Sequence, residues 1–416
     1  MVKLMQAHWF PLSSQGNIYT LTFLQSCKGS AKILVACLNR KIYSCEYHKH
    51  SEWHIKPLVK ELLFTYIPSG AEIIAIDAYN KSTTADEFVI GISIIKPTGE
   101  TCMERYLNIY SEGAVDGDDS ITSLESIAQS CLMVELSYTP YLLYHTIIPK
   151  SPDKEIVWLI SGSDYKIHGV REDKQNHSYT EFQLDKFFPE LDQLKAIALW
   201  IDIYYYDDFQ WRLTAISCEC GLLKLAKVNV DSLEIIQKWS LRYDNPVSSV
   251  RIFPNKFGVQ LPACLNVRSN ELNVKKDNKI NVMLTSGNKA VVFQNILHNQ
   301  LDSDITLGGN ESTSDFIVCS CIADINMDGK NEILLGTYKQ EVLIYESIND
   351  TWKLTDKKLF DAPVHSIKYL DLAGDGVKVL VIQTQRSVHI LQHDPQETMN
   401  LWSERFSKLV SLLDAR

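Results

Sequence analysis

The sequence predicts an all-β fold, a seven-bladed β-propeller with FG-GAP- or WD-like blades and a short C-terminal helix. Seven pairs of apolar strand-like segments recur along the chain, and successive pairs start about 45 to 70 residues apart, which is typical of propeller blades with loop insertions. Each pair follows another strand-like segment, and helical periodicity is rare. A closed ring of such sheets leaves no long strand edge exposed.

The clearest copy of the repeat is Asp315–Ser347. It contains an apolar strand, an acidic turn with a glycine, a second apolar strand, a polar turn and a third strand. The seven predicted strand pairs are Ile33–Tyr47, Glu87–Tyr110, Glu155–Glu172, Arg212–Val228, Ile280–Ile296, Glu332–Ser347 and Val377–His393. The strands that precede them are Asn17–Leu24, Glu72–Asn80, Tyr141–Ile148, Ile197–Asp208, Ser248–Pro254, Ile317–Gly329 and Val364–Gly376. Fourth strands are visible at Ser232–Asp244, at Thr351–Asp361 and, less clearly, at His54–Glu61.

The two ends of the chain differ from the blades between them. Residues 1–395 are predicted to form the propeller and residues 396–416 a helix, because the apolar residues of the last segment share one helical face. These residues are Met399, Trp402, Phe406, Leu409, Val410 and Leu413. The seventh strand pair lacks an outer strand, and Leu4–Pro11 is the natural donor, with an open ring as the alternative. Polar inserts at Ser111–Ser120, Asn255–Lys279 and His298–Ser314 are predicted to be loops.

The composition limits the classes of function. The chain has 416 residues and a net charge of -10, and it contains no run rich in Lys and Arg, which argues against nucleic-acid binding and against a polybasic membrane anchor. No segment approaches the ~18 apolar residues of a membrane span, and the N-terminus lacks the apolar region of a signal peptide. Ten cysteines lie without metal-site spacing, and we expect reduced, buried thiols in a cytoplasmic protein.

The loop from Asp324 to Glu332 is the sharpest chemical motif. Asp324, Asn326, Asp328 and Glu332 are spaced as in a compact loop that holds a hard cation, and the backbone carbonyl of Lys330 completes the candidate calcium ligands. The alternative is a turn held by hydrogen bonds without metal, and the short reach of the loop favours this alternative. No other cofactor is indicated.

In four of the strands that precede the predicted strand pairs, an aspartate follows an apolar residue near the end of the strand. These aspartates are Asp77, Asp202, Asp324 and Asp371. A carboxylate at such a position accepts hydrogen bonds from backbone N–H groups two residues further on and starts a turn, and this is the role predicted for all four. In the loop after Asp371, Ala373 and Val379 stand where the third-position ligand and the final acid would be, so this loop is not expected to bind calcium.

No enzyme motif is present. The sequence contains no G-x-S-x-G, P-loop or G-x-G-x-x-G pattern, so we predict that the protein is not an enzyme. A propeller enzyme is the alternative that would need acids or histidines converging on the channel, which periodicity cannot place. The aromatic residues between Trp200 and Trp211 are expected to pack in the core and at the rim.

Several longer strings resemble the kaptin family. They are KELLFTYIPSGAEIIAIDAYNKS (Lys60–Ser82), LNIY (Leu107–Tyr110), SLESIAQSCLMVELSYTP (Ser123–Pro140), FPEL (Phe188–Leu191), SVHILQH (Ser387–His393), SSQGNIY (Ser13–Tyr19) and the Asp324–Glu332 loop with its flanks. The resemblance runs nearly from end to end. No site residue of the family is carried over, and the partner-binding residues stay unassigned.

The resemblance implies a non-enzymatic scaffold subunit of the KICSTOR complex, cytoplasmic and peripheral on the lysosomal surface. That complex recruits the GATOR complex and negatively regulates mTOR kinase signalling when amino acids or glucose are scarce. The implied partners are an FG-GAP-type propeller protein, a very large scaffold subunit and GATOR. The alternative is an actin-filament-associated protein of lamellipodia and stereocilia, although an acidic chain without a basic patch is not expected to bind filaments strongly by itself.

Overall fold

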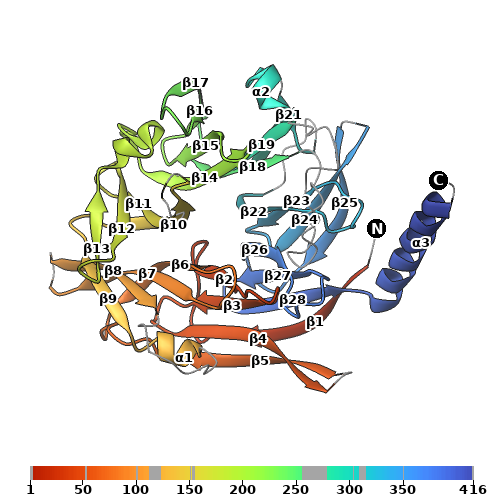
Figure 1. Ribbon diagram of the computed structural model, residues 1–416, viewed down its shortest axis with the longest axis horizontal. Helices are drawn as coiled ribbons and strands as arrows, with labels where there is room; N and C mark the ends of the chain where they lie inside the picture. The colour runs from red at the N-terminus through yellow and green to blue at the C-terminus, as the bar shows by residue number, and fades with distance from the viewer. Residues whose placement is uncertain are drawn as a thin grey trace.

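A computed structural model describes residues 3–51, 54–99, 102–111, 123–149, 151, 155–254, 279–302, 304–308, 315–349 and 351–414. In this part of the chain, 28 strands form seven four-stranded antiparallel sheets, which are arranged radially around a channel (Figure 1). The prediction of a seven-bladed β-propeller is confirmed. Nearly all of the predicted loops Asn255–Lys279 and Ser111–Ser120, and part of His298–Ser314, lie outside the described residues.

Each blade runs from an innermost strand at the channel to an outermost strand at the rim. The blades are β2 (Leu21–Gln25), β3 (Ala31–Ala36), β4 (Ile42–Ser51) and β5 (His54–Leu62); β6 (Glu72–Asn80), β7 (Phe88–Pro97), β8 (Met103–Ser111) and β9 (Cys131–Glu135); β10 (Pro140–Ile147), β11 (Ile156–Gly162), β12 (Ile167–Asp173) and β13 (Ser178–Phe182); β14 (Ala198–Tyr206), β15 (Trp211–Cys218), β16 (Leu222–Asn229) and β17 (Ile235–Arg242); β18 (Val247–Pro254), β19 (Ile280–Ser286), β20 (Lys289–Phe293) and β21 (Asp304–Thr306); β22 (Ile317–Ala323), β23 (Glu332–Thr337), β24 (Glu341–Ile348) and β25 (Thr351–Leu359); and β26 (Val364–Leu370), β27 (Val379–Thr384), β28 (Ser387–His393) and β1 (Leu4–Pro11). The helical elements are α1 (Leu124–Ile127), η1 (Leu184–Lys186), η2 (Pro189–Leu191), α2 (Ile296–Asn299) and α3 (Pro395–Asp414).

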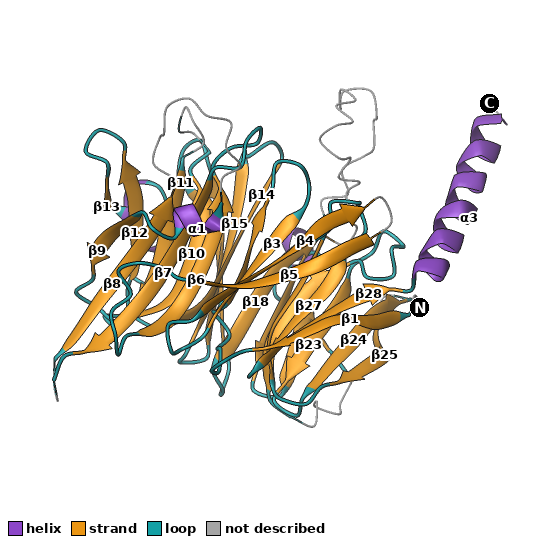
Figure 2. Cartoon of the chain, turned by 90° about the horizontal axis from the view of Figure 1, so that it is seen from below, coloured by secondary structure: helices purple, strands orange, loops and turns teal. Residues whose placement is uncertain are grey.

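The last blade combines both ends of the described chain. β1 pairs with β28 in antiparallel register, from Leu4 opposite His393 to Pro11 opposite Ser387, with a bulge between Gln6 and His8. The N-terminal strand therefore supplies the outermost strand of a sheet whose other three strands come from the C-terminal part of the propeller. After β28 the chain enters α3, which stands apart from the sheets (Figure 2).

The core lies between the blades. The second strand of a blade is buried on both faces, because each face packs against a neighbouring sheet, and every residue of β19 and β23 is buried. Such strands read as continuous apolar runs in the sequence. One outer strand differs from expectation, because β21 lies inside the segment His298–Ser314, which the sequence predicts to be a loop.

Among the described residues, no helix is both long and apolar enough to cross a membrane. The nine described cysteines are free, and Cys27, Cys102 and Cys220 are exposed. The prediction of buried thiols is therefore wrong for these three.

Four histidines lie in the closing blade, on β1, β26 and β28: His8, His365, His389 and His393. Burial lowers the pKa of each, and in each ring one nitrogen is buried without a hydrogen-bond partner. The rings also face polar groups: His389 contacts Ser387 Oγ at 2.9 Å and Asp361 at 3.5 Å, and His393 contacts Tyr369 Oη at 2.8 Å.

We predict that the closing blade makes the protein sensitive to mild acid. The folded state disfavours protonation of these rings, whereas the unfolded chain protonates near the ordinary pKa of about 6.5. The contribution of the neutral rings to the free energy of unfolding is therefore complete above pH ~6.5, and it is lost as the pH falls through the lowered pKa values of the folded state. The melting temperature of wild type should therefore fall between pH 7 and 5.5. The fall in melting temperature should be shallower in His393→Gln than in wild type. In the control His298→Gln, whose histidine is exposed on α2, the fall should be as steep as in wild type. Equal slopes in all three proteins would contradict the prediction.

Candidate functional site

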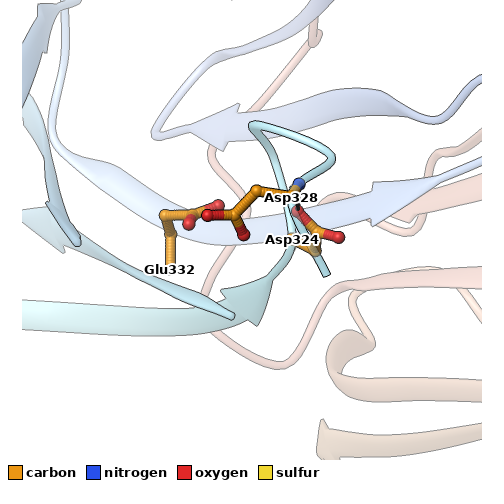
Figure 3. Close-up of side chains that lie close together, drawn as sticks. All are labelled: Asp324, Asp328 and Glu332. Carbon is orange, nitrogen blue, oxygen red and sulfur yellow. Dashed lines mark hydrogen bonds between the residues drawn. The ribbon is translucent and has the colours of Figure 1, made fainter. Parts of the chain in front are cut away.

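The loop between β22 and β23 brings three acidic side chains together. One carboxylate oxygen from each of Asp324, Asp328 and Glu332 lies within 4.8 Å of the others, and Figure 3 shows the three side chains around the turn. Among the described residues, this is the group of three or more His, Cys, Asp or Glu side chains whose geometry could hold a metal ion. The predicted site residues are thus neighbours in space.

Backbone N–H groups already use most of the acceptor atoms. Asp324 Oδ1 accepts from Asp328 N at 3.0 Å and Asp324 Oδ2 accepts from Gly329 N at 2.8 Å. Asn326 Oδ1 also accepts from Asp328 N, and Asp328 Oδ1 accepts from Lys330 N, both at 2.8 Å. Gly329 has a φ of +86°, which glycine adopts without the steric cost of a Cβ atom. The residues predicted as calcium ligands therefore fold a tight turn through their own hydrogen bonds.

Glu332 lies beneath this turn at the start of β23. Its side chain accepts from Ile325 N at 2.7 Å, Asn326 N at 3.2 Å and Asn326 Nδ2 at 2.9 Å. Burial raises its pKa to about 8, against the effect of these hydrogen bonds, and burial also raises the pKa of Asp324. Crowded carboxylates in a buried position can be stabilised by protonation or by a cation. Lys330, with Asn326 and Asp328, borders a hollow of about 240 Å³ next to Glu332.

The loop after β26 has a similar hydrogen-bonding frame but lacks two of the candidate ligands. Asp371 Oδ1 accepts from Ala373 N and Gly374 N, and its Oδ2 accepts from Gly376 N at 2.7 Å. Gly376 has a φ of +87°. Because this loop lacks the third-position and final ligands, the frame itself needs no cation, which supports the turn role for Asp324 as well.

Asp77 and Asp202 do not start turns, so the prediction for these two residues is wrong. They lie inside β6 and β14, and their carboxylates accept hydrogen bonds from the innermost strand of the next blade, at His145 N (2.8 Å) and Ile252 N (2.6 Å). The reason is local. β22 and β26 end directly before Asp324 and Asp371, whereas β6 and β14 continue past Asp77 and Asp202 to Asn80 and Tyr206.

The channel contains charged residues that the sequence did not single out. His145 Nδ1 lies 2.7 Å from Asp77 Oδ2, and although burial lowers the pKa of His145, the carboxylate raises it overall. Arg251 and Lys368 line the same cavity. An acid and a histidine thus do meet at the channel, as a propeller enzyme would require, but Asp77 also accepts the backbone N–H of His145, so the pair fastens two blades together.

A second candidate for contact with other molecules is α3. The exposed fractions of its apolar side chains are 68% for Met399, 52% for Trp402, 67% for Phe406 and 39% for Val410. Trp402 and Arg405 border a hollow of about 290 Å³ together with Asp324 and Lys378. The predicted amphipathic helix is thus formed and leaves much of its apolar face uncovered.

We expect the Asp324 loop to behave as a turn. Asp328→Ala removes the hydrogen bond to Lys330 N and should lower the free energy of unfolding by about 1 kcal/mol, equally in calcium and in chelator. The matched variant is Asp375→Ala, which removes the corresponding bond to Val377 N in the loop without the full ligand set. Denaturant unfolding of wild type and both variants measures the effect. Stabilisation by calcium in wild type and in Asp375→Ala, but not in Asp328→Ala, would instead establish a metal site.

Comparison with protein families agrees with the strings found in the sequence. The family model described as KICSTOR complex protein kaptin matches residues 4–403. The chain is 32% identical over 387 residues to mouse (Mus musculus) KICSTOR complex protein kaptin, and the match covers 92% of this chain and 86% of the mouse protein.

Solved structures share the architecture at low sequence identity. Raptor from Chaetomium thermophilum matches with a TM-score of 0.54 and 12% identity, over 94% of this chain and 29% of Raptor. The Dos1 propeller matches with a TM-score of 0.52 and 9% identity, over 94% and 95% of the two chains. The Myceliophteria thermophila Cps50 (Swd1) propeller domain matches with a TM-score of 0.50 and 9% identity, over 93% and 100%. At these identities the likeness shows the fold alone.

Proposed function

This chain belongs to the kaptin family of KICSTOR complex proteins, and from that membership we propose that it is a non-enzymatic scaffold subunit of a KICSTOR complex. The observation that carries the proposal is the family match over residues 4–403, which spans all seven blades. A closed propeller offers two faces and a rim to several partners at once, as a scaffold requires.

The proposal extends to the role of the complex. The protein acts at the cytoplasmic side of the lysosomal surface, where the complex recruits GATOR and restrains mTOR kinase signalling during amino-acid or glucose deprivation. Its direct partners are an FG-GAP-type propeller protein and a very large scaffold subunit. The net charge of -10 gives no support to a direct role in binding actin filaments, which are themselves acidic.

We place one contact with another KICSTOR subunit on α3. Met399, Trp402 and Phe406 are spaced by three and four residues, and Leu409 and Leu413 continue this spacing in the sequence. This is the pattern of a helix that packs against another helix. Exposed tryptophan and phenylalanine side chains are also the residue types that anchor protein interfaces, so the occupant expected on this face is a helix of a partner subunit.

Recovery of endogenous partners from cells tests both parts of the proposal. Tagged full-length wild type should recover KICSTOR and GATOR subunits, whereas Trp402→Asp combined with Phe406→Asp should lower the recovery of KICSTOR subunits at least about tenfold, because two anchor side chains are replaced by charges. The control carries the same charges on another face of the helix, as Asn400→Asp with Ser407→Asp, and should recover partners as wild type does.

The membership of the complex and the contact through α3 are disproved by different results. A wild-type protein that recovers neither complex would disprove the scaffold proposal, and cosedimentation with purified filaments would then test the actin alternative. Wild-type recovery by the Trp402 and Phe406 variant would remove α3 as the contact but would leave the membership of the complex intact.

A further inference from the structure

The channel holds a cavity of about 700 Å³ that is lined by residues of six innermost strands. At one end Tyr19 spans the channel, because its hydroxyl donates at 2.8 Å to the backbone oxygen of Leu199 in β14, three blades away. Ile76 N donates to the backbone oxygen of Tyr19 at 3.0 Å, and the Tyr19 ring stacks beside Trp200 with 6.1 Å between ring centroids. The other end reaches exposed residues, Gly29 and Thr83, in the turns after β2 and β6. The cavity is thus a pocket with its mouth on one face of the propeller.

The innermost strands carry charged side chains at one repeated position, and four residues of this set, Asp77, His145, Arg251 and Lys368, line the pocket. Six innermost strands share an irregularity near their start, and the residue two positions after it is equivalent from blade to blade. These residues are Asp77, His145, Asp202, Arg251, Cys321 and Lys368. The two acids and the histidine follow one another around the ring, and the two cations stand on the remaining arc.

The acids direct their oxygens into the framework of the propeller. Asp77 Oδ2 accepts from the backbone N and the ring Nδ1 of His145, and Asp77 Oδ1 accepts from Ala78 N at 2.9 Å and from Thr22 Oγ1 at 3.3 Å. Asp202 Oδ2 accepts from Ile252 N at 2.6 Å. Innermost strands have one open backbone edge, and these carboxylates satisfy donors on it. Both acids therefore complete the fold.

The cations retain free donors. Lys368 Nζ forms no hydrogen bond or ion pair with any described residue, and it lies 5.9 Å from the centre of the Phe23 ring. Arg251 Nη2 donates to Ser320 O at 3.2 Å, but Arg251 Nε is buried without an acceptor among the described residues. The guanidinium lies 4.3 Å from the centre of the Trp200 ring. Burial, and then the charge of Arg251, lower the pKa of Lys368.

Arg251 and Lys368 stand two blades apart around one recess. The carboxylates of Asp77 and Asp202 act on Lys368 through space, but their oxygens accept hydrogen bonds from the framework of the propeller. A desolvated donor without an acceptor is unfavourable.

We propose that the channel pocket binds a small organic anion, whose carboxylate or phosphate oxygens accept hydrogen bonds from Lys368 Nζ and lie beside the guanidinium of Arg251. The aromatic side chains of Phe23, Tyr144 and Trp200, which also line the pocket, contact the apolar part of this ligand. The anion supplies the acceptors that no described residue provides to Lys368 Nζ.

Calorimetric titration of the full chain at fixed ionic strength tests the proposal with benzoate, phenyl phosphate and inorganic phosphate, and with neutral benzamide as the matched probe. At least one of the two aromatic anions should bind saturably and raise the melting temperature, whereas benzamide should not. A preference for benzoate identifies a carboxylate site, and a preference for phenyl phosphate a phosphate site. Binding by inorganic phosphate as tight as that of phenyl phosphate would contradict the aromatic part of the proposal.

The variants separate binding from a structural role. Lys368→Met should weaken anion binding by about tenfold or more, because a charge-assisted hydrogen bond is lost. Without anion it should melt at or above the temperature of wild type, because a desolvated donor without an acceptor is removed. Arg251→Met provides a second, independent loss of affinity. Lys289→Met, at an exposed position of β20, should bind as wild type does. Failure of both aromatic anions to bind at millimolar concentration, or equal binding by Lys368→Met, would overturn the proposal.

Discussion

Ring closure is the constraint on which the rest of this structure depends. Each blade buries both faces of its central strands against its neighbours, so no blade has a complete core by itself. The pairing of β1 with β28 completes the blade in which the chain both begins and ends the ring, and it covers the backbone edge of β28 that would otherwise be open. The two buried histidines of that blade, His389 and His393, lie on β28 opposite Trp9 and Leu4 of β1.

At the channel, one edge of every innermost strand has no partner strand, so its backbone groups need other hydrogen-bond partners. The carboxylates of Asp77 and Asp202 accept backbone N–H groups of the next blade. The Tyr19 hydroxyl donates across the channel to the backbone oxygen of Leu199. These contacts fix the blades relative to one another. Arg251 of β18 adds a further contact through Ser320 O, whereas Lys368 of β26 is left without a hydrogen bond to any described residue. The pocket and its unpaired Lys368 thus arise from the way in which the inner edges are satisfied.

The sequence predicts the fold class because the repeat is a pattern of buried strands, and burial on both faces leaves continuous apolar runs such as those of β19 and β23. It misses β21 because three residues between polar loops carry no periodicity. It predicts the Asp324 turn because the acids and the glycine are neighbours in the chain. It does not predict the pocket, since Arg251 and Lys368 lie 117 residues apart and meet through the ring. A comparison of the blades at the position of the shared irregularity could have found them.

The four aspartates show how one local pattern acquires two roles. In each case the carboxylate follows an apolar residue near the end of an innermost strand, and sequence reasoning treats the four alike. β22 and β26 end at the residue before the aspartate, so Asp324 and Asp371 hold N–H groups of their own turns. β6 and β14 continue past the aspartate to Asn80 and Tyr206, and the carboxylates of Asp77 and Asp202 stay inside the ring, where they accept N–H groups of the next blade. The point at which the innermost strand ends therefore decides whether an aspartate stabilises a single loop or joins two blades.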